Sequence, residues 1–393
     1  MNTQELDKKY ILPTYARVDI EFVSGKNAHL TDTEGRNYID FTSGIGVVSV
    51  GHANSRVNDA ITKQLSNITH ISNLYNITPQ ALAGQKIVEA SGYDMQCFFG
   101  NSGAEANEGA IKIARKYGEI DGEIKRYKII TLKHSFHGRT ITTVKATGQE
   151  SMHNYFGPFP DGFVYADTIN DIENLLDDHT CAVMIELVQG EGGVQPQNKE
   201  EVQSLEKLLK KRNILLIVDE VQTGGFRTGE FTASQLYDIT PDIITLAKGI
   251  GGGVPVGVVM TSLKDILTAG DHGSTFGGNY LSSTAVCEVI DILNEYKLDG
   301  KLNDTIHYFN QKLEIFFNEN REIFTQKVGL GLMCGLRVID ADTLTNIVNS
   351  ARENGVIVLK AGRNTLRFLP PLTITKKEID EGFKALYLAM RTI

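Results

Sequence analysis

The sequence predicts an α/β protein with a large domain built on a mostly parallel sheet and a second, smaller α/β domain. Two observations favour this class. Short apolar runs recur along the first two thirds of the chain and alternate with helical patterns, which is typical of strands that helices bury on both faces. With 393 residues, the chain is also too long for a single hydrophobic core of ordinary size.

The large domain is expected to contain six strands that stand out as apolar runs. These runs are residues 97–99, 129–132, 182–185, 214–218, 243–246 and 256–260. Helices are expected between them over 104–117, where Ala110, Ile113 and Ala114 share one face, and over 202–212.

The smaller domain is indicated by long helical patterns that begin near Leu281. Strands are expected there over 328–338 and 356–359, and the last helix begins at a capping box formed by Thr375 and Glu378. We therefore expect an N-terminal segment (1–55) that joins the small domain, a large cofactor-binding domain (56–290) and a C-terminal small domain (291–393).

Composition excludes several classes of function. A net charge of −9 gives no support to nucleic-acid binding, and no apolar run approaches the length that spans a bilayer. The N-terminal stretch lacks the features of a secretory signal, so a cytoplasmic location is expected. The four cysteines lie far apart without a C-x-x-C pair, which argues against a disulfide framework and a zinc site, and no metal is expected.

The first candidate for ligand binding is the turn Gly100–Ala106, which follows the strand expected at 97–99. Small residues with free N–H groups at the start of a helix form an anion site, because the helix dipole and the unpaired donors both favour phosphate. The alternative is a simple capped turn.

Two charged residues end buried strands. Asp219 follows Leu215–Val218, where it could bind a metal, cap a helix or hold a proton on a heterocyclic nitrogen. Lys248 follows Ile243–Ala247, and lysine is rarely buried without a partner or a task. Because ligands bind at the carboxyl ends of the strands in a parallel sheet, both residues are candidates for one site.

The chemistry that explains both residues is that of pyridoxal 5′-phosphate (PLP), whose enzymes use a lysine imine and an acid on the pyridinium nitrogen. Asp219 would keep that nitrogen protonated, and Lys248 would act as general base and acid once the substrate has displaced it. Desolvation is expected to lower the pKa of Lys248.

The turn Lys133–Thr140 offers two further candidates. Phe136 could lie flat on the pyridine ring, and Arg139 could bind a substrate carboxylate through its two-pronged donor geometry. Taken alone, a phenylalanine in such a turn is more often a core residue, and an arginine is more often a member of a surface ion pair.

Six motifs in order resemble the class III (fold type I) PLP aminotransferases across nearly the whole chain, most closely the acetylornithine and ornithine aminotransferases. These motifs are Phe98–Glu108, Phe136–Arg139, Glu186–Gly193, Asp219–Gly224, Leu246–Lys248 and His272–Asn279. The resemblance implies a fold type I large domain with a seven-stranded, mostly parallel sheet, a smaller α/β domain and PLP as cofactor.

The resemblance also implies roles for individual residues around the cofactor. Ser102, Gly103 and Ala104 would hold its phosphate, Phe136 would stack on the ring, Val221 would pack on the opposite face and Gln222 would lie near the phenolic oxygen; Glu220 is counted with them. Thr275 would come from the neighbouring subunit, which implies a homodimer with active sites at the subunit interface.

The substrate residues are implied in the same way. Arg367 resembles the arginine that binds the α-carboxylate of glutamate, and Glu191 the acid that covers this arginine when the other amino donor is bound. Ser274 and Tyr15 are expected near the substrate together with Arg139.

The substrate is expected to be N2-acetyl-L-ornithine with 2-oxoglutarate as acceptor, as in arginine biosynthesis, because Gly44–Val47 resembles the acetylornithine branch. Leu187 and Tyr280 depart from the family pattern, where proline is usual. Ornithine, succinylornithine, succinyldiaminopimelate and 4-aminobutyrate remain alternative donors. Two other classes are weighed: a nicotinamide-dependent dehydrogenase, suggested by Gly329–Gly335 without the required glycine spacing, and a non-catalytic PLP-binding scaffold.

Overall fold

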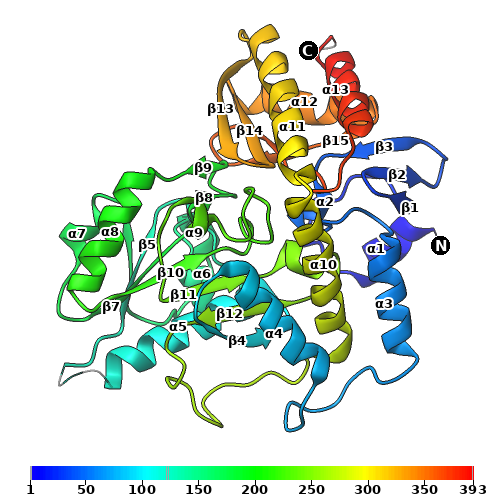
Figure 1. Ribbon diagram of the computed structural model, residues 1–393. Coiled ribbons are helices and arrows are strands. Elements are labelled where there is room, and N and C mark those ends of the chain that lie inside the picture. The colour runs from blue at the N-terminus through cyan, green and yellow to red at the C-terminus, as the bar shows by residue number, and fades with distance from the viewer. Residues whose placement is uncertain (1, 121, 123, 392) are drawn as a thin grey trace.

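A seven-stranded sheet forms the core of the larger part of the molecule (Figure 1). The computed structural model describes all residues except 1, 121, 123 and 392. The strand order is β4 (Gln96–Gly100), β12 (Gly257–Thr261), β11 (Ile243–Leu246), β10 (Leu215–Asp219), β7 (Thr180–Ile185), β5 (Lys128–Leu132) and β6 (Phe163–Ala166). β12 runs antiparallel to both of its neighbours, and the remaining pairs are parallel. The mostly parallel sheet expected from the sequence is confirmed.

Helices cover both faces of this sheet, which explains why its strands are apolar throughout. Leu216 and Val218 of β10 pack in one cluster with α8 (Lys199–Lys211), whereas Leu215 and Ile217 pack in another with α5 (Gly103–Ile120). Alternate residues of a strand point to opposite faces, so a strand covered on both sides has no polar face. The helices expected over 104–117 and 202–212 correspond to α5 and α8.

A second sheet lies in the C-terminal part, in the order β13 (Phe324–Leu330), β14 (Met333–Val338), β17 (Thr365–Phe368) and β16 (Leu359–Ala361). The single strand expected over 328–338 is wrong: the stretch crosses a hairpin whose turn contains Gly331 at φ +60°. Such a φ suits glycine, which has no side chain to clash. The last helix, α13 (Lys376–Met390), starts with the expected capping box of Thr375 and Glu378.

Both ends of the chain contribute to a third sheet, formed by β1 (Phe22–Lys26), β2 (His29–Asp32), β3 (Asn37–Asp40) and β15 (Val356–Ile357). β15 pairs with β3 in parallel, so the segment expected as one strand over 356–359 is divided between two sheets. Figure 1 shows these strands next to α13 at the end of the molecule away from the seven-stranded sheet.

The long helix α10 (Tyr280–Leu298) connects the two parts and packs on α3 (Ser55–Leu65) and α4 (Thr78–Ser91) (Figure 1). The division proposed at residue 290 falls inside this helix, and α11 (Lys301–Glu319) follows it. The remaining elements are α1 (Thr3–Tyr10), α2 (Ser43–Gly46), α6 (Ile141–Ala146), η1 (Glu150–His153), α7 (Ile172–Leu175), β8 (Val188–Gln189), β9 (Gln195–Pro196), α9 (Ala233–Leu236), η2 (Lys248–Gly251) and α12 (Ala341–Glu353). None of the helices in the described part of the chain is both long and apolar enough to cross a membrane.

Candidate active site

Two neighbouring parallel strands deliver a carboxylate and an amine to the same edge of the sheet. β10 ends at Asp219, which is in register with Thr245 of β11, and Lys248 is the second residue after the end of β11. Lys248 opens the short helix η2 with φ +43°, an uncommon conformation for a residue with a side chain. Both side chains line a cavity of about 420 Å³.

Ten of the residues expected at the site line this cavity. They are Ser102, Gly103, Ala104, Phe136, Arg139, Glu191, Asp219, Val221, Gln222 and Lys248. They come from five separate stretches of sequence, which the parallel strands bring together at their carboxyl ends.

Three donors fix the orientation of the Asp219 carboxylate, which is 4% exposed. Its Oδ2 accepts hydrogen bonds from Nδ2 of Asn107 and Nδ1 of His137, each at 2.8 Å, and its Oδ1 accepts one from the Val221 amide at 3.0 Å. Buried carboxylates need such donors because burial without hydrogen bonds is costly. The arrangement holds a negative charge at a fixed place in the cavity.

The buried environment of the Lys248 amine favours its neutral form. Burial lowers its pKa, although the nearby carboxylates of Glu191 and Asp219 act in the opposite direction. Nζ of Lys248 forms no hydrogen bond or ion pair with any residue that the structure describes. An amine with a lowered pKa is more often neutral, and the neutral form is the nucleophile.

The N-terminus of α5 forms a tight, small-residue cradle at the cavity wall. A Cβ on Gly103 would lie 2.7 Å from Cγ1 of Val221, and a Cβ on Gly257 would collide with the Ser102 carbonyl. Only glycine therefore lets the backbone approach this closely. Ser102, Gly103 and Ala104 line the cavity at the positive end of an 18-residue helix, a position that favours a phosphate group.

Two arginines differ sharply in their surroundings. Arg367 is 2% exposed, and its Nη1 lies 2.6 Å from Oε1 of Glu191. The Nε of Arg367 is buried and has no hydrogen-bond partner within the described residues. Arg139 is exposed, and its guanidinium lies 5.6 Å from the centre of the Phe136 ring.

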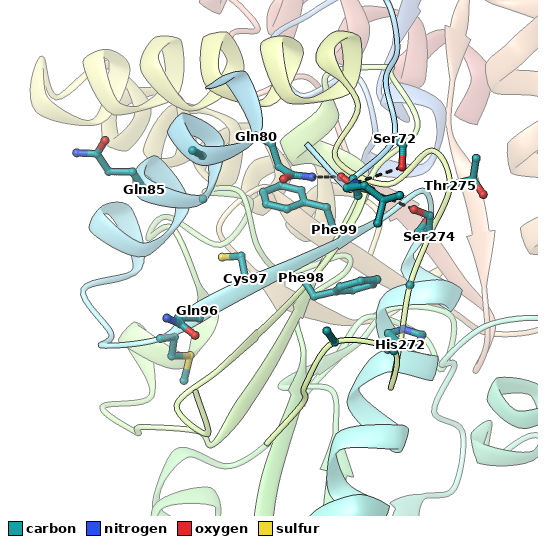
Figure 2. Close-up of a pocket in the computed structure, with 18 of the residues that line it drawn as sticks. Ser72, Gln80, Gln85, Gln96, Cys97, Phe98, Phe99, His272, Ser274 and Thr275 are labelled. Atoms are coloured by element: carbon teal, nitrogen blue, oxygen red, sulfur yellow. Dashed lines mark hydrogen bonds between the residues drawn. The ribbon is translucent and has the colours of Figure 1, made fainter. Parts of the chain in front are cut away.

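Five expected residues are not among those that line this cavity. One is Arg367, which pairs with the lining residue Glu191, and the others are Ser274, Thr275, Tyr15 and Glu220. Ser274 and Thr275 line a separate hollow of about 1100 Å³, and Figure 2 shows them on the loop that borders it near Ser72. Tyr15 is 74% exposed on the N-terminal segment. The Glu220 carboxylate is buried and accepts hydrogen bonds from the Ala233 and Ser234 amides, so in this chain it caps α9 and does not face the cavity.

Three polar residues of the cavity received no role from the sequence. Asn107 and His137 hold Asp219, and Glu186 accepts a hydrogen bond from the Phe136 amide. Asn107 lies one turn into α5 from the glycine turn, on the same side as Gly103, so helical spacing could have suggested it. The contacts of His137 and Glu186 join residues 82 and 50 positions apart and leave no local signal.

A family model described as "Aminotransferase class-III" matches residues 12–390, which is almost the whole chain. The chain belongs to the class-III aminotransferases. It is therefore a PLP-dependent transaminase, and the dehydrogenase alternative is excluded.

Individual relatives agree with this assignment. The chain is 56% identical over 391 residues to an acetylornithine aminotransferase of Wolinella succinogenes, covering 99% of this chain and 100% of the relative. It is 40% identical to an acetylornithine/succinyldiaminopimelate aminotransferase of Buchnera aphidicola, with coverage of 99% and 96%. Its structure resembles the ornithine aminotransferase of Toxoplasma gondii with a TM-score of 0.93 and 31% identity, covering 100% of this chain and 96% of that one.

The cavity fits PLP in the places where the cofactor needs partners. Lys248 offers an unpaired amine, Asp219 a fixed carboxylate and the start of α5 a cradle for an anion. The amide oxygen of Gln222 is buried without a hydrogen-bond partner in the described part of the chain, so it is free to accept a hydrogen bond from a group bound in the cavity. These residues would hold the aldehyde, ring nitrogen, phosphate and phenolic oxygen, respectively.

Proposed function

We propose that this class-III aminotransferase transfers the terminal amino group of N2-acetyl-L-ornithine to 2-oxoglutarate, giving N-acetyl-L-glutamate 5-semialdehyde and L-glutamate, as in arginine biosynthesis. The observation that carries the proposal is the ion pair between Glu191, which lines the Lys248 cavity, and the buried Arg367. The donor reacts through its terminal amine, whereas glutamate reacts through its α-amine. The two substrates therefore place their carboxylates differently in the same pocket. Such a pocket needs an arginine whose charge can be neutralised when no carboxylate binds to it. The name of the Wolinella relative supports the choice of donor.

Bound PLP supplies an electron sink for the carbon that loses its proton. Lys248 would hold the cofactor through its Nζ, and its free amine would carry a proton to and from the reacting carbon. The Asp219 carboxylate, held by Asn107 and His137, keeps a positive charge on the ring nitrogen. Phe136 and Val221 line the cavity and would cover the two faces of the ring, which would keep the ring in place and exclude water from it.

Two arginines would divide the binding of the carboxylates. Arg139 lies exposed at the cavity and can bind the distant carboxylate of either substrate. Arg367 binds the α-carboxylate of glutamate, and Glu191 neutralises it when the other donor occupies the pocket.

Succinyldiaminopimelate is a second candidate donor, because a Buchnera relative carries both activities in its name. Ornithine, succinylornithine and 4-aminobutyrate have the same terminal amine. The test is a steady-state comparison of these donors with 2-oxoglutarate as acceptor. Acetylornithine should give the highest kcat/KM, and a clear preference for any other donor would replace it.

We also propose a cytoplasmic homodimer in which Thr275 of each subunit reaches the cofactor phosphate of the partner, while Ser274 and Tyr15 approach the substrate. Thr275 is exposed on a loop beside the 1100 Å³ hollow and does not reach the cavity of its own chain. Leu74, Tyr75 and Phe276 are exposed apolar residues in the same region, as expected of a surface that another subunit covers. Sedimentation analysis would test the assembly.

A further inference from the structure

Glu186 connects two turns of the active site through one carboxyl group. It directly follows β7, is 6% exposed and lines the Lys248 cavity. Its Oε2 accepts the Phe136 amide at 2.9 Å, and its Oε1 accepts the Gly190 amide at 3.3 Å. The turn that contains the Phe136 amide also carries the Phe136 ring and Arg139. The turn that contains the Gly190 amide also carries Glu191.

Burying a carboxyl group to join two backbone amides costs free energy, because the charged form loses its hydration. Glu186 has no cationic side chain within ion-pair distance among the described residues, and the charged or titratable groups that act on it are His137, Asp219 and Lys248. Burial and the Asp219 charge raise its pKa to about 7, against the influence of His137 and the two amides. A simple spacer would avoid the cost of burying this acid.

The turn that Glu186 holds has little freedom on its other sides. A Cβ on Gly190 would collide with the Gln222 amide, and the Glu191 carbonyl accepts the Gly362 amide at 2.9 Å. The Glu191 side chain therefore leaves a short, fixed turn toward Arg367. Loss of the Glu186 contact would release an anchor that joins this turn to the Phe136 turn.

We propose that Glu186 is a positioning residue for transamination, which ties the Phe136 turn to the Glu191 turn and thereby sets how firmly Glu191 covers Arg367. This inference rests on the proposed function, since it assigns Glu186 a part in choosing between the two amino substrates. A looser Glu191 leaves Arg367 more easily. The half-reaction with glutamate should then become faster relative to the half-reaction with the donor that needs Arg367 neutralised.

The test compares wild-type holoenzyme with Glu186→Gln and Glu186→Asp. A glutamine oxygen can accept only one of the two amides, and aspartate is too short to reach both. The control is Gln189→Leu, because Nε2 of Gln189 donates to the Lys133 carbonyl at 2.8 Å and so joins the same two segments without touching the carboxyl group. Amide hydrogen exchange and the two half-reactions are measured for each protein.

We expect the Phe136 or the Gly190 amide to exchange about tenfold faster in both Glu186 variants, as for the loss of one buried hydrogen bond. The ratio of the glutamate to the acetylornithine half-reaction should rise about three- to tenfold in both variants and stay unchanged in Gln189→Leu. If Glu186→Gln fails to fold, Glu186→Asp decides alone. Unchanged exchange at both amides, or equal losses in both half-reactions, would overturn the proposal. Wild-type enzyme without activity on acetylornithine would instead sink the proposed function, and the exchange result would still stand.

Discussion

The guanidinium of Arg367 is buried to 2% exposure and pairs with Glu191, whose carboxylate lies 2.6 Å away at the wall of the Lys248 cavity. The arginine is therefore neutralised by a residue of the neighbouring turn when no substrate carboxylate is present. In the proposed function, this pair would let one cavity bind two amino substrates that place their carboxylates differently.

Replacing Arg367 with alanine should damage one half-reaction selectively. A bidentate, charge-assisted contact in a desolvated site is worth roughly 2–4 kcal/mol, or about 30- to 1000-fold in a specificity constant. Arg367→Ala should lose this factor with glutamate and largely keep the reaction with acetylornithine, whereas Arg139→Ala should damage both. Stopped-flow measurement of each half-reaction checks this. Arg337→Ala, which removes a buried arginine of β14 that donates to the Gln195 side chain, serves as the control. Equal losses for Arg367→Ala in both directions would rule out the switch.

Replacing Asp219 with asparagine should weaken PLP binding and lower turnover by at least about 100-fold, because a neutral amide does not stabilise the pyridinium charge. The matched control is Asp242→Asn at the other end of the same strands, where Asp242 accepts the Leu216 amide at 2.8 Å. Cofactor affinity by absorbance titration should fall for Asp219→Asn alone. Similar behaviour of the two variants would mean that Asp219 has only a structural role.

The raised pKa of Glu186 predicts a pH-dependent difference in stability. The folded chain holds this proton up to about pH 7, whereas an ordinary glutamate releases it near 4.5, so the unfolding free energy from this group falls as pH rises between these values. The full effect is roughly 3 kcal/mol. Glu186→Gln lacks this titration, so its unfolding midpoint relative to the wild type should be more favourable at pH 8 than at pH 5. A difference that is constant across this range contradicts the raised pKa.

The proposal that Thr275 of one subunit completes the cofactor site of the other can be tested by mixing two defective variants. Thr275→Ala should bind PLP weakly, and Lys248→Ala should bind it without turnover. In a mixed dimer, the intact Lys248 of one subunit meets the intact Thr275 of the other, so refolding an equal mixture should restore about a quarter of the sites. Absence of any recovery, with mixed dimers confirmed by mass spectrometry, would refute the shared site.

The sequence singled out Asp219 and Lys248 as candidate reacting groups because they interrupt strong patterns. Asp219 and Lys248 each end a buried apolar run, and the capping box at Thr375 marks the start of α13. β6 was missed, although Phe163–Ala166 is an apolar run of the same length as β11. The hairpin at Gly331 was missed because its glycine turn continues the alternation of the flanking strands.

The hydrogen bonds that hold Asp219 and Phe136 in place could not be predicted from the sequence, for a different reason. His137 reaches Asp219 across 82 residues, and Glu186 reaches Phe136 across 50, so both contacts depend on the final packing. The antiparallel direction of β12 was equally invisible, because a strand buried on both faces has the same apolar pattern in either direction.

The assignment of Lys248 as the lysine that binds PLP can be tested by reducing the holoenzyme with borohydride and mapping the modified peptide by mass spectrometry. We expect the cofactor to be fixed to Lys248, and we expect Lys248→Ala to stay folded and bind PLP but to form no reducible linkage and no longer transaminate. Cofactor attached to a different lysine, or turnover retained by Lys248→Ala with an unchanged absorbance spectrum, would contradict it.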